Sequence, residues 1–147
     1  MKSIAAFIDF SEISKHVIEQ AAAIARRFYA DLHIIHIAAP DPAFVSHRGG
    51  HHHERDWRAL NLHKEHQMLH DTAVILSGEG LSVTPVLIQG DTVDKIMEES
   101  QRLHADLLVL GSHGHGALYN LVMGSVCEEV LHRCSRPMLL IPPVKRT

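Results

Sequence analysis

Glycines gather in one short stretch of the chain and make it suited to binding an anion. Within fourteen residues stand Gly111, Gly114, Gly116 and Gly124. The apolar run Asp106–Leu110 before them predicts a buried strand, and Ser125 after them begins a helical pattern. Glycine tolerates positive φ and lets another group approach the main chain closely. Because unpaired N–H groups and the helix dipole both favour negative charge, we expect a phosphate cradle between this strand and this helix.

This stretch differs from the two best-known phosphate-binding loops. A P-loop carries Lys and Ser or Thr after its second glycine, whereas Ala117 and Leu118 follow Gly116. A dinucleotide fingerprint needs a third glycine where Tyr119 stands. Phosphate binding would therefore depend mainly on backbone donors, and we expect Mg²⁺ or Mn²⁺ to neutralise much of the charge.

Apolar runs alternate with helical patterns along the whole chain, which predicts an α/β fold with a parallel sheet covered on both faces. Strands are expected at Ile4–Ile8, Leu32–Ile37, Val83–Ile88, Asp106–Leu110 and Met138–Ile141. Pro85 favours an edge position for the third strand, because a missing N–H is tolerated there. If the strand order is 3-2-1-4-5, the order reverses between the first and fourth strands, and ligands bind at such a reversal. Asp9 would then lie beside the glycine-rich stretch.

Four helices are expected between these strands. The first carries Ile13, Val17, Ala21, Ile24 and Phe28 at helical spacing. The second, near Arg55–Ser77, has a core face made of Leu62, His66, Leu69, Ala73 and Leu76. Asp91 and Thr92 can cap the third, whose apolar side contains Val93, Ile96, Ser100 and Leu103. The fourth runs from Ser125 to Cys134, and residues 38–50 are expected to form a loop.

Composition limits the classes of protein to consider. The 147 residues predict one domain over 1–147, and the formal charge of −3 does not favour a nucleic-acid partner. No apolar run approaches the roughly 20 residues that span a bilayer, and Met1-Lys2 leads into a strand without a signal-peptide pattern. Cys127 and Cys134 would stand about 10 Å apart along one helix, too far for a disulfide. Free thiols suit a cytoplasmic protein.

The pattern Gly111-x2-Gly114-x9-Gly124-Ser125 resembles the nucleotide-binding motif of the universal stress protein family. The resemblance covers nearly the whole chain, from the strand that ends in Asp9 through the Gly90-Asp91 turn to Arg136-Pro-Met-Leu-Leu-Ile-Pro. It implies a Rossmann-like fold of the adenine nucleotide alpha-hydrolase-like type, with five parallel strands in the order 3-2-1-4-5. It also implies a homodimer through strand five, Met138 to Val144.

Members of that family with this glycine pattern bind ATP, and the resemblance assigns roles to individual residues. Asp9 is expected to contact the adenine or ribose, with Ile8 and Phe10 on either side of it and Ile37 lining the adenine pocket. Around the ribose and phosphates would lie Leu110, Gly111, His113 and Gly114. Donors to the phosphates would come from Gly124, Ser125, Val126 and Cys127.

Two residues depart from the family pattern. Phe10 stands where many members have glycine, so its ring would either narrow the adenine pocket or pack outward. Cys127 stands where a hydroxyl residue is common, so one hydrogen bond to phosphate is expected to be weaker.

Other interpretations of these residues stay open. Ser125 and Glu128 fit a capping box, Asp9 could cap the first helix, and a helix N-terminus could lower the pKa of Cys127. Histidines at 51–53, or His63, His66 and His70 on one helix face, could bind a metal, although zinc needs a further ligand. His66 also falls on the expected core face. AMP or a cyclic nucleotide could replace ATP, and a binding module without nucleotide is the main rival.

The residues best fit an ATP-binding universal stress protein that acts as a nucleotide-dependent sensor or adaptor for an unidentified protein partner. No nucleophile, base for water activation or arginine finger is evident, so hydrolysis is expected to be slow or absent.

Overall fold

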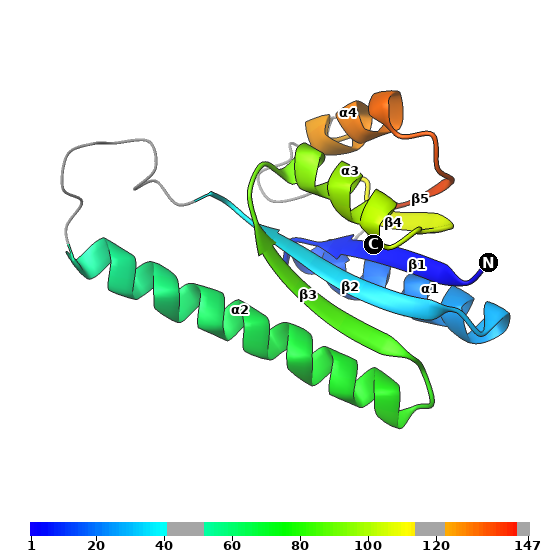
Figure 1. The fold of residues 1–147 in the computed structure, drawn as a ribbon, viewed down its shortest axis with the longest axis horizontal. Coiled ribbons are helices and arrows are strands. Elements are labelled where there is room, and N and C mark those ends of the chain that lie inside the picture. Colours follow the sequence, from blue (N-terminus) through cyan, green and yellow to red (C-terminus); the bar gives the residue numbers. More distant parts are fainter. Residues whose placement is uncertain (41–51, 114–122, 144–147) are drawn as a thin grey trace.

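Five parallel strands and four helices alternate along the chain in the computed structural model, which describes residues 1–40, 52–113 and 123–143 (Figure 1). The strands are β1 (Ser3–Ile8), β2 (Asp31–Ala38), β3 (Val83–Gln89), β4 (Leu107–Gly111) and β5 (Met138–Ile141). The helices are α1 (Glu12–Phe28), α2 (His52–Gly78), α3 (Thr92–Arg102) and α4 (Ser125–Arg133). No helix in the described part of the chain is long and apolar enough to cross a membrane.

The sheet has the order β3-β2-β1-β4-β5, which confirms the order that the family resemblance implied. All four strand pairs are parallel, with Ile8 beside His36 and Phe7 beside Leu110 in register. β3 is an edge strand, which confirms the position expected from Pro85. The order reverses between β1 and β4, so the carboxyl ends of these two strands open toward a shared crevice.

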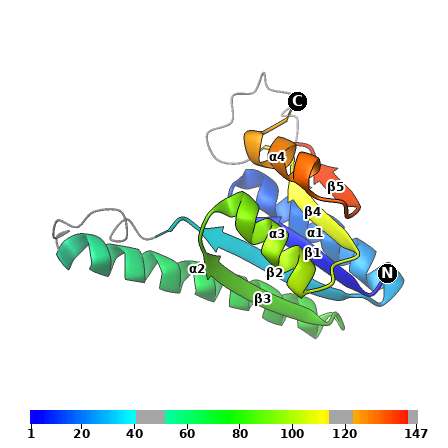
Figure 2. The ribbon, with the colours of Figure 1, turned by 45° about the horizontal axis from the view of Figure 1, so that its top comes forward.

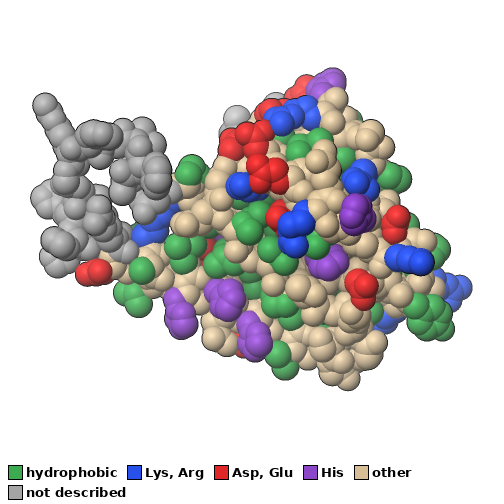
Figure 3. Space-filling view, viewed as in Figure 1, with side chains coloured by type: hydrophobic (Ala, Val, Ile, Leu, Met, Phe, Trp, Pro, Cys, Tyr) green, Lys and Arg blue, Asp and Glu red, His purple; other side chains and the backbone are tan. Residues whose placement is uncertain are grey.

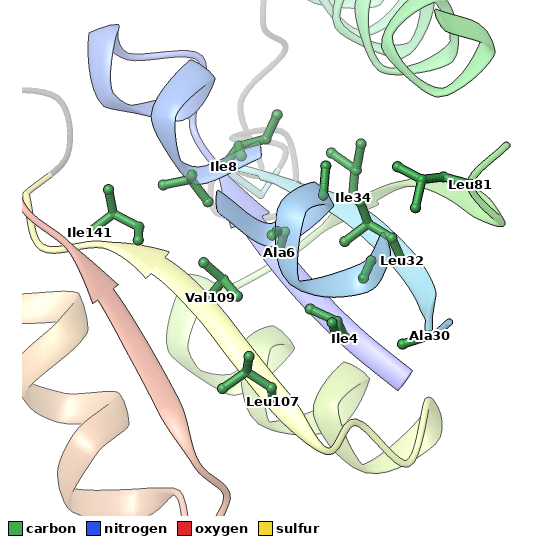
Figure 4. Packing of buried hydrophobic residues seen from close by; sticks show 14 of the residues in the cluster. Ile4, Ala6, Ile8, Ala30, Leu32, Ile34, Leu81, Leu107, Val109 and Ile141 are labelled. Carbon is green, nitrogen blue, oxygen red and sulfur yellow. The ribbon is translucent and has the colours of Figure 1, made fainter. Parts of the chain in front are cut away.

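Helices cover both faces of the sheet and enclose two apolar cores (Figures 1 and 2). On one face, α1 and α2 cover a core that includes Ile4, Leu32 and Val109, which Figure 4 labels on three neighbouring strands. On the other face, α3 and α4 contribute Ile96 and Val130 to the second core. Burial on both faces explains why the central strands are continuously apolar.

The helices begin and end close to the predicted residues, with some differences. Asp91 caps α3, and its side chain accepts a hydrogen bond from Asp94 N at 3.1 Å. Phe28 is 53% exposed because it is the last residue of α1, beyond the buried part of the helix. The prediction that His66 faces the core is wrong: His66 is exposed, and Glu65 takes the inward position one residue earlier.

Candidate functional site

A cleft of about 650 Å³ opens at the carboxyl ends of β1 and β4, where the strand order reverses. This volume falls within the usual range for small-molecule sites. The first turns of α1 and α3 and the start of α4 complete its walls, so helix N-termini surround it. Ten of the predicted site residues line the cleft: Ile8, Asp9, Ile37, Leu110, Gly111, His113, Gly124, Ser125, Val126 and Cys127.

Two other predicted site residues do not line this cleft in the structure. Phe10 packs against the apolar core beneath α1 and α2 and is not among the residues that line the cleft, and Gly114 lies outside the described residues. The Phe10 ring packs against the His36 ring, with the centroids 4.7 Å apart and the planes tilted by 56°. Phe10 therefore packs away from the cleft instead of narrowing it. Its φ of 59° lies in the left-handed region that glycine adopts more easily.

Asp9 organises the turn between β1 and α1. Its Oδ1 atom accepts hydrogen bonds from Ser11 N at 3.0 Å and from Ser14 Oγ at 3.1 Å. The Ser11 hydroxyl donates to the same oxygen. The residue at the N-cap of α1 is Ser11, so the interpretation of Asp9 as the helix cap is wrong. These contacts fix the carboxylate at the mouth of the cleft.

The start of α4 presents main-chain donors to the cleft. The N-cap residue is Gly124, and no side chain caps the helix. The capping box proposed for Ser125 and Glu128 is therefore absent, because Ser125 is the first helical residue and lies one position too late. A Cβ at Gly124 would stand 3.2 Å from Ser112 O, the carbonyl that already accepts the Gly124 N–H at 2.8 Å.

Cys127 closes the floor of the cleft beneath that helix turn. Its Sγ donates to Gly111 O at 2.9 Å, which ties α4 to the end of β4. Burial raises the pKa of the thiol, and the negative charge of Asp9 raises it further. The interpretation of Cys127 as a thiol with a lowered pKa is therefore wrong, because desolvation opposes the thiolate here. Both cysteines are free, as predicted.

Close packing explains the glycine at the end of β4. A Cβ on Gly111 would lie only 2.8 Å from Ile13 Cγ2, so α1 approaches this strand as closely as a glycine permits. The next residue, Ser112, is buried, and its Oγ lies 2.9 Å from His113 Nδ1. His113 thereby gains a contact within the wall of the cleft.

Sequence reasoning missed several wall residues. They come from the strand ends and from the first turns of α1 and α3: Phe7, Ile13, Ser14, Val17, Ile35, Ala39, Thr92, Ile96 and Ser112. Most are apolar or small, and nothing in their local pattern separates them from ordinary core residues. Thr92 could have been predicted from the sequence. It begins a helix that follows a parallel strand, so it had to lie at the same edge of the sheet as Asp9.

The histidines near the middle of α2 lie on the surface of the helix. His63, His66 and His70 are exposed on the helix, where Figure 3 shows histidine side chains on the molecular surface. Among the described residues, no three His, Cys, Asp or Glu side chains are arranged to hold a metal ion. Residue 51 and the side chains of residues 52–55 are outside the described part of the chain, so the alternative of a metal site at residues 51–53 is not tested.

The strand order and the cleft at the point where it reverses define a doubly wound parallel α/β protein. The sequence pattern of the universal stress protein family matches residues 1–142, so the chain belongs to that family. One relative is the universal stress protein MJ0531 of Methanocaldococcus jannaschii. It is 27% identical over 148 residues, which cover 99% of this chain and 84% of the relative.

Solved structures share the fold. The protein MJ0577 superposes with a TM-score of 0.83 at 19% identity, covering 99% of this chain and 98% of the other. A universal stress protein in complex with cAMP gives 0.67 at 21% identity, covering 96% of both chains. The Archaeoglobus fulgidus protein in complex with dAMP gives 0.62 at 17% identity, covering 95% of this chain and 96% of the other.

Proposed function

We propose that residues 1–147 form one nucleotide-binding domain that binds ATP in the cleft between β1 and β4, together with Mg²⁺ or Mn²⁺. The single observation that carries this proposal is the uncapped start of α4, which faces an acidic strand end across a cleft of about 650 Å³. An adenine nucleotide needs an apolar wall for the base, an acceptor for the ribose hydroxyls and donors for the phosphates. The residues present fit all three needs.

The base and ribose would occupy the β1 side of the cleft. Ile8 and Ile37 supply apolar surface there, and the Asp9 carboxylate is an acceptor for hydroxyl groups. Asp9 is already oriented by Ser11 and Ser14, which lowers the cost of arranging it for a ligand. The known complexes of two family members, with cAMP and with dAMP, support an adenine ligand for this chain.

The phosphates would lie over the first turn of α4. Ser125, Val126 and Cys127 offer N–H groups at the positive end of the helix dipole, with no side-chain cap to compete. The Gly124 position leaves room that a side chain would take. A bound Mg²⁺ or Mn²⁺ would neutralise phosphate charge that no P-loop lysine is present to meet.

We propose a regulatory role for this binding, as a sensor or adaptor, with slow or no hydrolysis. The charged side chain among the described cleft residues is Asp9, and its Oδ1 atom accepts bonds from two serines. A nucleotide that binds one conformation better than another shifts the population toward it, which is sufficient for partner selection. The exposed side of β5 would pair with a second copy through Met138 to Val144, although Val144 is outside the described residues.

A second candidate ligand is AMP or a cyclic nucleotide. The complexes of relatives with cAMP and dAMP favour it. Contacts of the base and ribose with Asp9 and the apolar wall do not depend on how many phosphates the ligand carries. Titration calorimetry with ATP, AMP and cAMP, with and without Mg²⁺, separates the candidates. In the presence of Mg²⁺, the affinity for ATP should be higher than the affinity for AMP. Tighter binding of cAMP would favour the second candidate, and no binding of any of the three would reject the proposed function.

A further inference from the structure

His36 occupies a buried position directly behind the predicted nucleotide contact. It lies on β2, only 7% exposed, on the face of the sheet opposite the cleft-lining Ile35 and Ile37. Its register partner on β1 is Ile8, the residue before Asp9. Its ring packs against Phe10, the residue after Asp9. The imidazole therefore contacts both chain neighbours of Asp9.

Both ring nitrogens of His36 face oxygen atoms. Nδ1 lies 2.9 Å from Ile8 O, and Nε2 lies 3.3 Å from Glu65 Oε2 on α2. A backbone carbonyl and an ionised carboxylate only accept hydrogen bonds. A neutral imidazole has one N–H and can satisfy only one of these oxygens, whereas the imidazolium ion satisfies both.

Apolar residues lie around much of the ring. At the level of His36, β1 and β3 present the apolar residues Ile8 and Leu87, and Phe10 covers the ring. Glu65 is the charged group from α2, with its side chain 32% exposed. A further titratable group is Asp9, between Ile8 and Phe10 in the chain, and its Oδ1 accepts from Ser11 and Ser14.

The charge of His36 also bears on the strained turn. Phe10 has a φ of 59°, which is unfavourable for a bulky residue. A cation within about 6 Å of an aromatic ring is attracted to it, and the two ring centroids are 4.7 Å apart. A positive charge on the His36 ring would therefore add attraction to Phe10 on one side of Asp9 and to the Ile8 carbonyl on the other.

We propose that His36 is a positioning residue of the nucleotide site: as an imidazolium ion it bridges Ile8 O and Glu65 and holds the Asp9 turn. This inference rests on the proposed function, because its consequence is that nucleotide affinity depends on the charge of His36. Loss of one ring proton breaks either the contact with the strand end or the contact with α2.

The test combines ¹⁵N NMR of the His36 ring with calorimetric ATP affinities at about pH 6 and about pH 8, a range in which histidine charge changes. In the wild type, both ring nitrogens of His36 should carry protons at the lower pH. His36→Phe keeps a ring against Phe10 but removes both nitrogens, and should weaken ATP binding about tenfold at that pH. The difference from the wild type should shrink at the higher pH.

Glu65→Gln separates charge from shape. Its amide can donate to Nε2 of a neutral ring, so the variant should keep the affinity while losing the pH difference seen in the wild type. His33→Phe is the matched control. His33 lies on the same strand, is flanked by Asp31, Glu99 and Arg102, and should leave the pH difference unchanged. Since ATP itself titrates in this range, each result is read as a difference between proteins.

The outcomes distinguish the inference from the proposed function. A neutral His36 ring at the lower pH, or equal pH dependence in the wild type and Glu65→Gln, overturns the inference and leaves ATP binding intact. No ATP binding by the folded wild type at either pH overturns the proposed function, and the inference with it.

Discussion

Substitution of Asp9 separates its part in the turn from its part in the ligand site. Asp9→Ala removes the oxygen that accepts from Ser11 N, Ser11 Oγ and Ser14 Oγ. At about 1 kcal/mol for each hydrogen bond, the free energy of unfolding should fall by about 2–3 kcal/mol. Asp9→Asn keeps an oxygen at that position and should lose only about 1 kcal/mol. Urea unfolding measures both changes.

Asp9→Ala and Asp9→Asn should differ less in their affinity for ATP than in their free energy of unfolding. A hydrogen bond from a ligand hydroxyl to a charged acceptor contributes about 1.5–3 kcal/mol, so Asp9→Asn should weaken ATP binding by about tenfold to a hundredfold. Ser11→Ala is the control. It loses one hydrogen bond to Asp9, and the Ser11 side chain makes no capping hydrogen bond to α1 although Ser11 is the N-cap residue. It should bind ATP within about threefold of the wild type. A folded Asp9→Asn protein with unchanged ATP affinity would refute the assigned role of the carboxylate.

Three further predictions concern the cleft and the sheet edge. Gly124→Val places a Cβ 3.2 Å from Ser112 O and should lower the unfolding free energy by about 1 kcal/mol and ATP affinity by at least about tenfold, measured by calorimetry; equal affinity would argue against phosphate at this helix. The raised pKa of Cys127 means that its thiolate forms only at higher pH, so iodoacetamide should modify it more slowly than free glutathione, and faster in Asp9→Asn. Bound ATP should slow this reaction further, and no protection would contradict the site. Light scattering should give the mass of two chains, and a concentration-independent monomer would contradict pairing through β5.

The fold could be predicted from the sequence because its signals are local and repeated. Apolar runs such as Leu32–Ile37 alternate with helical spacing, and Pro85 identified an edge strand that the structure confirms. The strand order itself needed the resemblance to a family, since periodicity does not determine which strands are neighbours.

The site was harder to predict because it depends on contacts between distant segments. The type of residue at Phe10 did not reveal that its ring would face His36. The start of α4 at Ser125 was predicted, but no local rule indicated that the helix would lack a side-chain cap. His66 was misplaced because helical spacing alone is accurate only to about one residue, or 100° around a helix. That difference exchanges His66 for Glu65, the partner of His36.

The most direct test of the central claim is a crystal structure of the protein with ATP and Mg²⁺. The account predicts adenine beside Ile37, the ribose hydroxyls at Asp9, and the phosphates against the N–H groups of Ser125, Val126 and Cys127. A nucleotide bound elsewhere, or a cleft without nucleotide at saturating ATP, would contradict it.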